Sequence, residues 1–129
     1  MTEVHLHIYD LSNGMAKQFS RQLTGTQIDG IYHTGIVVFG KEFYYGGGIS
    51  YDPPGKTPFG PAHRVQLMGQ TELPEDMFME FLREISPNFT MQTYNVLENN
   101  CNNFTNECCN FLLGKDIPSE IIDLPKTFL

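Results

Sequence analysis

The chain has 129 residues and a formal net charge of −7, with 40% hydrophobic and 18% charged residues. This length and composition indicate a single domain, residues 1–129, that is long enough to bury a core. No apolar run is long enough for a membrane span, and an acidic chain without a basic cluster argues against a nucleic-acid partner. The first residues lack the basic and then apolar layout of a signal peptide, so we expect an intracellular protein, in the cytoplasm, the nucleus or both.

The first third of the chain has the periodicity of a strand, a short helix and a two-stranded hairpin. The predicted elements are a half-buried strand over residues 4–9, a helix over 15–23 that ends at Gly25, a strand over 31–39, a two-residue turn at Gly40-Lys41 and a returning strand over 42–45. Glycine at the first position of such a turn is a common hairpin signal.

The rest of the chain predicts a long loop followed mainly by helices. Repeated glycine and proline make residues 46–61 a loop, which at this length is either functional or mobile. A further strand is possible over residues 64–68. Pro74, followed by Glu75 and Asp76, opens a helix that Ser86-Pro87 ends. The order of elements indicates a small α+β domain.

A second helix is predicted to begin near Cys101. Asn99 or Asn100 is a good N-cap, and Gly114 suits the left-handed position after the last turn. At 100° per residue the apolar face holds Cys101, Phe104, Thr105, Cys108, Phe111 and Leu112, and the opposite face holds Asn102, Asn103, Asn106, Glu107 and Asn110. Cys101 then lies in the first turn, where free N–H groups and the helix dipole favour a thiolate. Such a thiol is a candidate nucleophile.

A cysteine nucleophile needs a base, and His33 is the best candidate of the four histidines. At the start of the second strand it would be held rigidly, and it could accept the thiol proton and later protonate a leaving amine. The alternatives are a histidine hydrogen-bonded in or near the core and, for Cys101, a small buried hydrophobic residue. The residues alone do not decide between the catalytic and the structural role, either for His33 or for Cys101. Cys108 and Cys109, in mid-helix, are expected to be structural.

An acyl-transfer site also needs hydrogen-bond donors for an oxyanion. The Cys101 N–H is a natural first donor. Asn95 is the candidate for the second, because it lies six positions before Cys101, the offset of the oxyanion glutamine in papain-like proteases; the alternative is a turn residue. His5 and His7 share one strand face, but no spaced pair of ligands completes a tetrahedral set, so we expect no metal and no cofactor.

Motifs along nearly the whole chain resemble one family. They are Ile8-Tyr9-Asp10-Leu11-Ser12, Gly30-Ile31-Tyr32-His33-Thr34, Gly46-Gly47-Gly48-Ile49, Pro53-Pro54-Gly55, Tyr94-Asn95-Val96-Leu97, Asn100-Cys101-Asn102-Asn103-Phe104, Ile117-Pro118 and Asp123-Leu124-Pro125. The histidine motif and the Asn-Cys-Asn motif are specific in combination. The chain resembles the PPPDE superfamily and, within it, the smaller type of the desumoylating isopeptidase (DeSI) family.

This resemblance implies a permuted papain-like fold, in which an antiparallel sheet packs with helices and the catalytic cysteine begins a helix. His33 precedes Cys101, the reverse of papain's order, and the pair would act as nucleophile and base of a thiol hydrolase. The resemblance also implies conjugates of SUMO-type or ubiquitin-type modifiers as partners, and a homodimer. A modifier tail ending in Gly-Gly suits a narrow slot, for which Tyr32, Gly47, Gly48, Asn100 and Asn102 are the expected groove residues.

Three functions follow from these observations. The first is a thiol-dependent isopeptidase that cleaves SUMO-type, or ubiquitin-type, modifiers from protein lysines through the Cys101 and His33 dyad. The second is an acyl-protein (palmitoyl) thioesterase with the same dyad, an activity assigned to some family members. The third is a binding or scaffold domain that has the fold without turnover.

Overall fold

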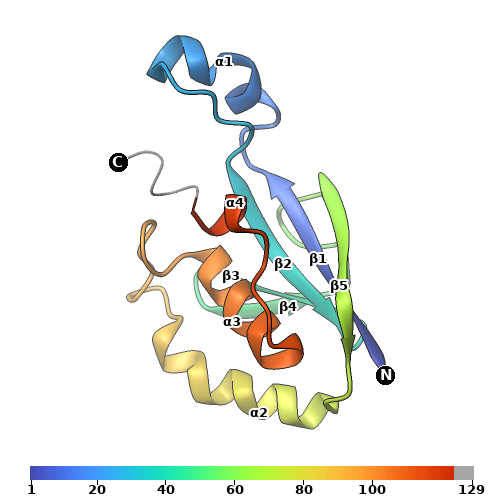
Figure 1. Ribbon diagram of the computed structural model, residues 1–129. Helices are drawn as coiled ribbons and strands as arrows, with labels where there is room; N and C mark the ends of the chain where they lie inside the picture. The colour runs from blue at the N-terminus through green and yellow to red at the C-terminus, as the bar shows by residue number, and fades with distance from the viewer. Residues whose placement is uncertain (124–129) are drawn as a thin grey trace.

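A five-stranded antiparallel sheet with α3 across one face forms the body of the protein in the computed structural model, which describes residues 1–123 (Figure 1). The elements are β1 (Thr2–Asp10), α1 (Met15–Thr24), β2 (Tyr32–Val38), β3 (Lys41–Tyr45), β4 (Ile49–Asp52), β5 (Arg64–Thr71), α2 (Glu75–Ile85), the 3-10 turn η1 (Ser86–Asn88), α3 (Cys101–Leu113) and α4 (Ser119–Ile122). The strand order is β4-β3-β2-β1-β5. The α+β architecture predicted from the sequence is confirmed.

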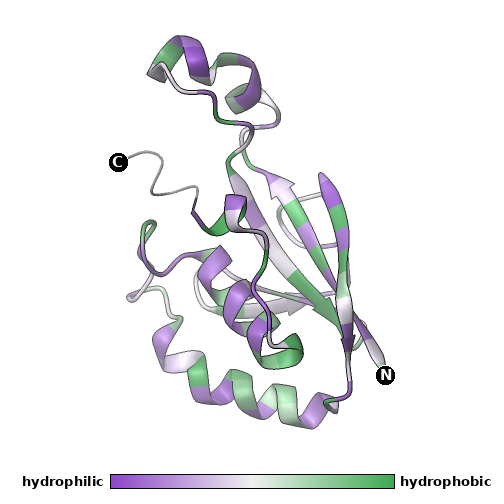
Figure 2. Cartoon of the chain, in the orientation of Figure 1, coloured by the Kyte–Doolittle hydropathy of each residue, from purple (hydrophilic) through white to green (hydrophobic). Residues whose placement is uncertain are grey.

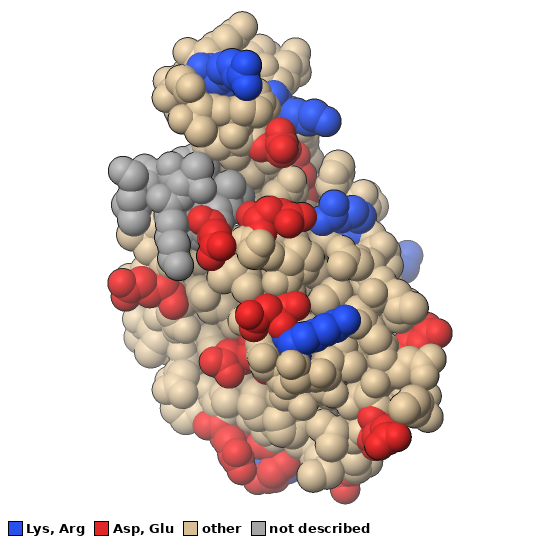
Figure 3. Space-filling view, viewed as in Figure 1, with Lys and Arg blue, Asp and Glu red and all other residues tan. Residues whose placement is uncertain are grey.

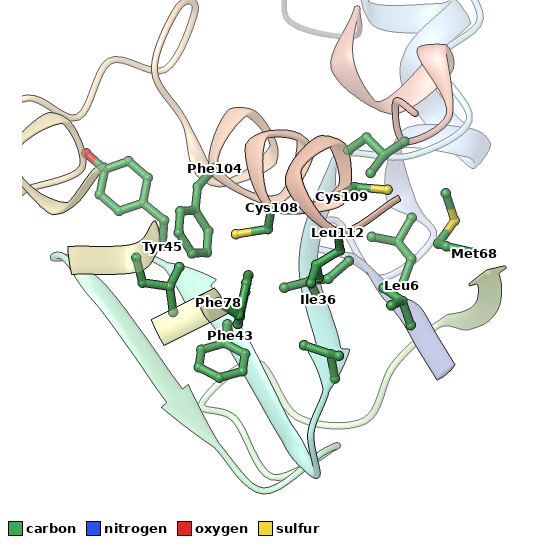
Figure 4. Close-up of a cluster of buried hydrophobic side chains, with 14 of the residues drawn as sticks. Leu6, Ile36, Phe43, Tyr45, Met68, Phe78, Phe104, Cys108, Cys109 and Leu112 are labelled. Atoms are coloured by element: carbon green, nitrogen blue, oxygen red, sulfur yellow. The ribbon is translucent and has the colours of Figure 1, made fainter. Parts of the chain in front are cut away.

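The core lies between the sheet and the helices. Alternation along the strands points Leu6, Ile36 and Phe43 toward α3, where Cys108 and Leu112 are buried (Figure 4). Figure 2 shows this alternation of hydrophobic and hydrophilic residues along β1. The structural role predicted for Cys108 is confirmed, because its side chain is fully buried in this core.

Two local predictions were wrong, and one short helix was missed. The hairpin turn is Phe39-Gly40, not Gly40-Lys41: both turn residues have positive φ, 56° and 73°, and Val38 pairs with Lys41. The predicted loop contains β4, whose backbone pairs with β3 from Glu42↔Asp52 to Tyr45↔Ile49. This edge strand lies between glycines and prolines and is too short to show a hydrophobic periodicity, which is why the sequence did not predict it. The short helix α4, which follows Pro118, was missed; Leu124 and Pro125 of the last motif lie outside the described residues.

The helix α1 projects beyond one end of the sheet, away from α2 and α3 (Figure 1). On the face shown in Figure 3, acidic side chains are spread over the body of the protein, whereas α1 carries basic ones. Its sequence has Lys17 and Arg21 but no Asp or Glu. No helix within residues 1–123 combines the length and the apolar character that a membrane crossing requires.

Candidate active site

Cys101 is the first residue of α3, as the sequence predicted, and Asn100 is the N-cap. The Asn100 side chain accepts hydrogen bonds from the backbone N–H groups of Asn102, at 2.9 Å, and Asn103, at 3.2 Å. In return the Asn103 side chain accepts from the Asn100 N–H at 2.8 Å, which completes a capping box. The cap holds the first turn of α3 rigidly and so fixes the Cys101 sulfur.

Asn102 joins this turn to β2, although the helical projection placed it on the solvent face. Its amide nitrogen donates to the Tyr32 carbonyl oxygen at 3.0 Å, and its amide oxygen accepts from the Thr34 hydroxyl at 2.7 Å. These two residues flank His33 in sequence. The Asn102 side chain is buried because the start of α3 packs directly on β2. Asn102 therefore fixes the strand that carries His33 against the helix that carries Cys101.

Replacement of Asn102 by alanine is expected to lower the free energy of unfolding by about 1–3 kcal/mol, because the Tyr32 carbonyl and the Thr34 hydroxyl lose their partner. Urea denaturation of the wild type, Asn102→Ala and Glu107→Ala measures this effect. Glu107 is an exposed residue of the same helix, so its replacement should change stability little. Equal stability of the two variants would show that the Asn102 hydrogen bonds do not stabilise the fold.

His33 lies on the sheet face opposite to Thr34 and Ile36, in a shell of aromatic rings. Its ring stacks on Phe59, with centroids 3.6 Å apart and planes at 22°, and lies 5.4 Å from the Tyr9 ring and 6.3 Å from the Tyr44 ring. The side chain is 1% exposed, and its Nε2 atom has no hydrogen-bond partner among residues 1–123. Packing against aromatic rings therefore holds the imidazole of His33 in place.

Cys101 and His33 line one cavity of about 400 Å³. Its other lining residues are Leu11, Tyr45, Gly46, Phe59, Met91 and Tyr94. A second, more apolar cavity of about 300 Å³ meets the first at Cys101 and is lined by Leu11, Ile31, Tyr32, Tyr94, Val96, Leu97, Asn100, Asn102 and Ile121 as well. Cys101 thus lines both cavities, and His33 lines one of them.

The protonation states in this unliganded site differ from the sequence-based prediction. Burial raises the pKa of the Cys101 thiol above its ordinary value, although hydrogen bonds from Thr34, Tyr94 and the start of α3 act in the opposite direction. The expectation of a resting thiolate was therefore wrong, since desolvation outweighs the helix terminus. Burial also lowers the pKa of His33 to about 4. At neutral pH the site holds a thiol and a neutral imidazole.

The buried His33 is expected to make the fold sensitive to acid. Its pKa falls from 6.5 to about 4 on folding, so between these values the unfolded chain binds more protons and stability decreases as pH falls. At about 1.4 kcal/mol per pKa unit, the loss is about 3 kcal/mol between pH 7 and pH 4. Urea titrations of the wild type and His33→Gln over this range measure it. A decrease of equal size in both proteins would assign the acid sensitivity to other groups.

The other residues predicted for the site divide into two groups. Tyr32, Asn100 and Asn102 line the apolar cavity beside Cys101. Gly47 and Gly48 line neither of the two cavities at Cys101. Their neighbour Gly46 lines the cavity that His33 also lines. Gly48 instead forms a backbone bridge with Thr90, which joins this turn to the segment before α3.

Asn95 is also outside both cavities. Its side-chain oxygen accepts from the N–H groups of Leu97, at 2.9 Å, and Glu98, at 3.0 Å, which is the geometry of an Asx turn. This is the turn alternative considered for it. The oxyanion role of Asn95 stays a prediction that this geometry does not favour.

The sequence reasoning missed two aromatic residues beside the dyad. Tyr94 lines both cavities together with Cys101, and its ring packs on Tyr45 with centroids 5.1 Å apart. Phe59, in a loop rich in proline and glycine, stacks on His33. Tyr94 could have been found from its place in the motif before Cys101. Nothing in the sequence indicated Phe59, because only the folded loop brings this residue next to β2.

Comparison with known proteins places the chain in one family. The family model described as "PPPDE putative peptidase domain" matches residues 2–129. The chain is 47% identical to desumoylating isopeptidase 1 of Homo sapiens and 42% identical to that of Xenopus laevis, each over 98% of this chain and 76% of the relative. It is 35% identical to the DeSI-like protein sdu1 of Schizosaccharomyces pombe, over 91% of this chain and 61% of the relative. With a papain-like α+β fold and a match over its whole length, the chain belongs to the PPPDE peptidase family.

Proposed function

We propose that this protein is a thiol isopeptidase that removes SUMO-type modifiers from lysine side chains, with Cys101 as nucleophile and His33 as base. The observation that carries the proposal is that Cys101, at the start of α3, and the buried His33 line the same cavity. The relatives named desumoylating isopeptidase 1 support the class of substrate. No cofactor is needed for this chemistry.

The reaction starts from the neutral pair. As the Cys101 sulfur attacks the isopeptide carbonyl carbon, its proton passes to His33, and the C–S bond forms while the carbonyl oxygen becomes an oxyanion. The Cys101 N–H at the start of α3 is the first donor to this oxyanion, since Asn100 caps the next two N–H groups. The C–N bond then breaks, and His33 protonates the leaving lysine amine. Water, deprotonated by His33, hydrolyses the thioester.

Modifier probes with a carboxy-terminal electrophile test the proposal. SUMO and ubiquitin probes are incubated with the wild type and Cys101→Ala, and adducts are identified by intact mass and peptide mapping. We expect the SUMO probe to label Cys101 of the wild type and neither probe to label the variant. Labelling by ubiquitin alone would change the substrate class, and labelling of Cys108 or Cys109 would contradict the assigned nucleophile.

An acyl-protein thioesterase is the second candidate function. The apolar cavity of about 300 Å³ beside Cys101 favours it, because Leu11, Ile31 and Val96 give it walls that suit an acyl chain. An S-acyl peptide and a SUMO-lysine conjugate, hydrolysed side by side by the same preparation, separate the two functions. Thioester hydrolysis without isopeptide cleavage would make the thioesterase the principal activity.

A scaffold without turnover is the third candidate. Slow alkylation of the Cys101 thiol at neutral pH would be expected of such a scaffold, but this result would not distinguish it from an active enzyme. Burial already raises the pKa of this thiol, so an active enzyme would also alkylate slowly at neutral pH. Turnover of a conjugate is the measurement that distinguishes them.

We also propose that the protein acts as a homodimer inside the cell, in the cytoplasm, the nucleus or both. Exposed apolar side chains near the cavities, such as Leu11, Val96 and Leu97, are the support for self-association. Light scattering coupled to gel filtration at two protein concentrations tests the dimer. A monomer mass at both would contradict it.

A further inference from the structure

Within residues 1–123, aromatic rings surround the buried imidazole of His33. Its Nε2 atom is buried and has no hydrogen-bond partner among residues 1–123. In catalytic triads, a carboxylate or an amide hydrogen-bonded to the ring nitrogen that faces away from the nucleophile fixes the ring orientation. Some other contact must therefore set the angle of the imidazole toward Cys101.

Phe59 makes the closest ring contact with His33. The two rings are nearly parallel, at 22°, with centroids 3.6 Å apart, whereas Tyr9 and Tyr44 contact His33 at larger distances and angles. Tyr9 and Tyr44 also pack against Phe59, at 6.0 Å and 5.9 Å. The three rings enclose the imidazole and leave it open toward the cavity that Cys101 lines.

A buried carboxylate fixes the loop that carries Phe59. Glu42 is 0% exposed; it accepts hydrogen bonds from the Gly55 N–H at 3.0 Å and from the Tyr9 hydroxyl at 2.6 Å. Thr57 is buried, and its hydroxyl oxygen accepts a hydrogen bond from the Phe59 N–H at 3.4 Å. Gly35 makes room for the carboxylate, because a Cβ atom at this position would lie 2.5 Å from a Glu42 oxygen. The loop is thus anchored at Gly55, close to Phe59.

We propose that Phe59 is the positioning residue of His33, and that ring stacking replaces the polar third member of a catalytic triad. The inference rests on the proposed role of His33 as the base. Stacked aromatic pairs have a defined geometry, and the stack restricts rotation of the imidazole about its bond to Cβ. It also covers the ring and keeps it neutral and able to accept the Cys101 proton.

The first test needs no substrate and therefore does not depend on the proposed activity. NMR of the His33 ring protons in the wild type should show an upfield ring-current shift and a pKa near 4. In Phe59→Ala the upfield shift should disappear and the pKa should rise toward 6.5, and Phe59→Tyr should restore both. Tyr9 from β1, Tyr44 from β3, Cys101 from α3 and Tyr94 from the segment before α3 also face this region, and burial raises the pKa of each, so they stay neutral over this range. Glu42 from β3 is an acidic group on this side of the sheet, and it accepts a hydrogen bond from the Tyr9 hydroxyl.

The second test is kinetic. Phe59→Ala should lower kcat for a SUMO-lysine conjugate by about 10- to 100-fold, as expected for a misplaced catalytic group, and Phe59→Tyr should stay within about 3-fold of the wild type. Tyr51→Ala is the matched control, because Tyr51 is an exposed aromatic residue of β4 that packs on Phe43 and not on His33.

Three results would overturn the proposal. They are an unshifted His33 spectrum in the wild type, an unchanged His33 pKa in a folded Phe59→Ala, and a loss in Phe59→Tyr as large as in Phe59→Ala. An effect on KM alone would place Phe59 in substrate binding instead. If no variant and no wild type cleaved the conjugate, the NMR result would still decide whether the stack holds His33, and the failure would belong to the proposed function.

Discussion

Replacement of Cys101 by alanine is expected to abolish isopeptide cleavage, with a loss of about 10⁴-fold or more in kcat. No other thiol in the chain can take its place. Cys108 and Cys109 are residues of α3 whose side chains are fully buried, and burial raises the pKa of both thiols. Cleavage of a SUMO-lysine conjugate, followed by gel and mass analysis, measures the loss.

The matched control is Cys109→Ala, which removes a sulfur of the same helix from the core and not from the cavities (Figure 4). It should lower stability modestly and keep kcat within a few-fold of the wild type. Equal binding of a conjugate by wild type and Cys101→Ala would show that the variant is folded. Turnover by a purified Cys101→Ala comparable to that of the wild type would refute the nucleophile assignment.

The features predicted correctly are those that neighbouring residues determine. The start of α3 follows from Asn100 as N-cap, and its end from Gly114 in the left-handed conformation. The strand β1 follows from alternating apolar residues, and β2 follows from a run of β-branched and apolar residues. Together with the family resemblance, these local signals were enough to select Cys101 and His33. Both residues line the same cavity.

The features that were missed depend on tertiary contacts. Asn102 is on the polar side of a helical projection, yet the fold buries it against Tyr32 and Thr34. The thiolate prediction considered only the helix terminus, whereas the folded chain removes Cys101 from water and reverses the direction of the pKa shift. Phe59 stacks on His33 only in the folded protein, because the pairing of β1, β2 and β3 forms the sheet face on which the loop with Phe59 packs. A sequence pattern contains none of these distances.

Replacement of His33 by glutamine is expected to lower kcat/KM by about 10²- to 10⁴-fold at neutral pH and to change its pH dependence. In the wild type the reactive form is the thiol beside a neutral imidazole. Because the pKa of His33 is lowered to about 4 and that of Cys101 is raised, kcat/KM should be flat around neutral pH and fall only toward pH 4 or toward high pH.

In His33→Gln the base is gone, so only the small fraction of Cys101 thiolate can react. This fraction increases about tenfold per pH unit below the thiol pKa, and kcat/KM of the variant should therefore rise steadily from pH 6 to pH 9. Measurement of both proteins on the same SUMO-lysine conjugate, with the folded fraction determined at each pH, gives the comparison. A variant profile as flat as that of the wild type would mean that His33 does not accept the Cys101 proton, and the assignment of the base would then have to move to another residue of the cavity.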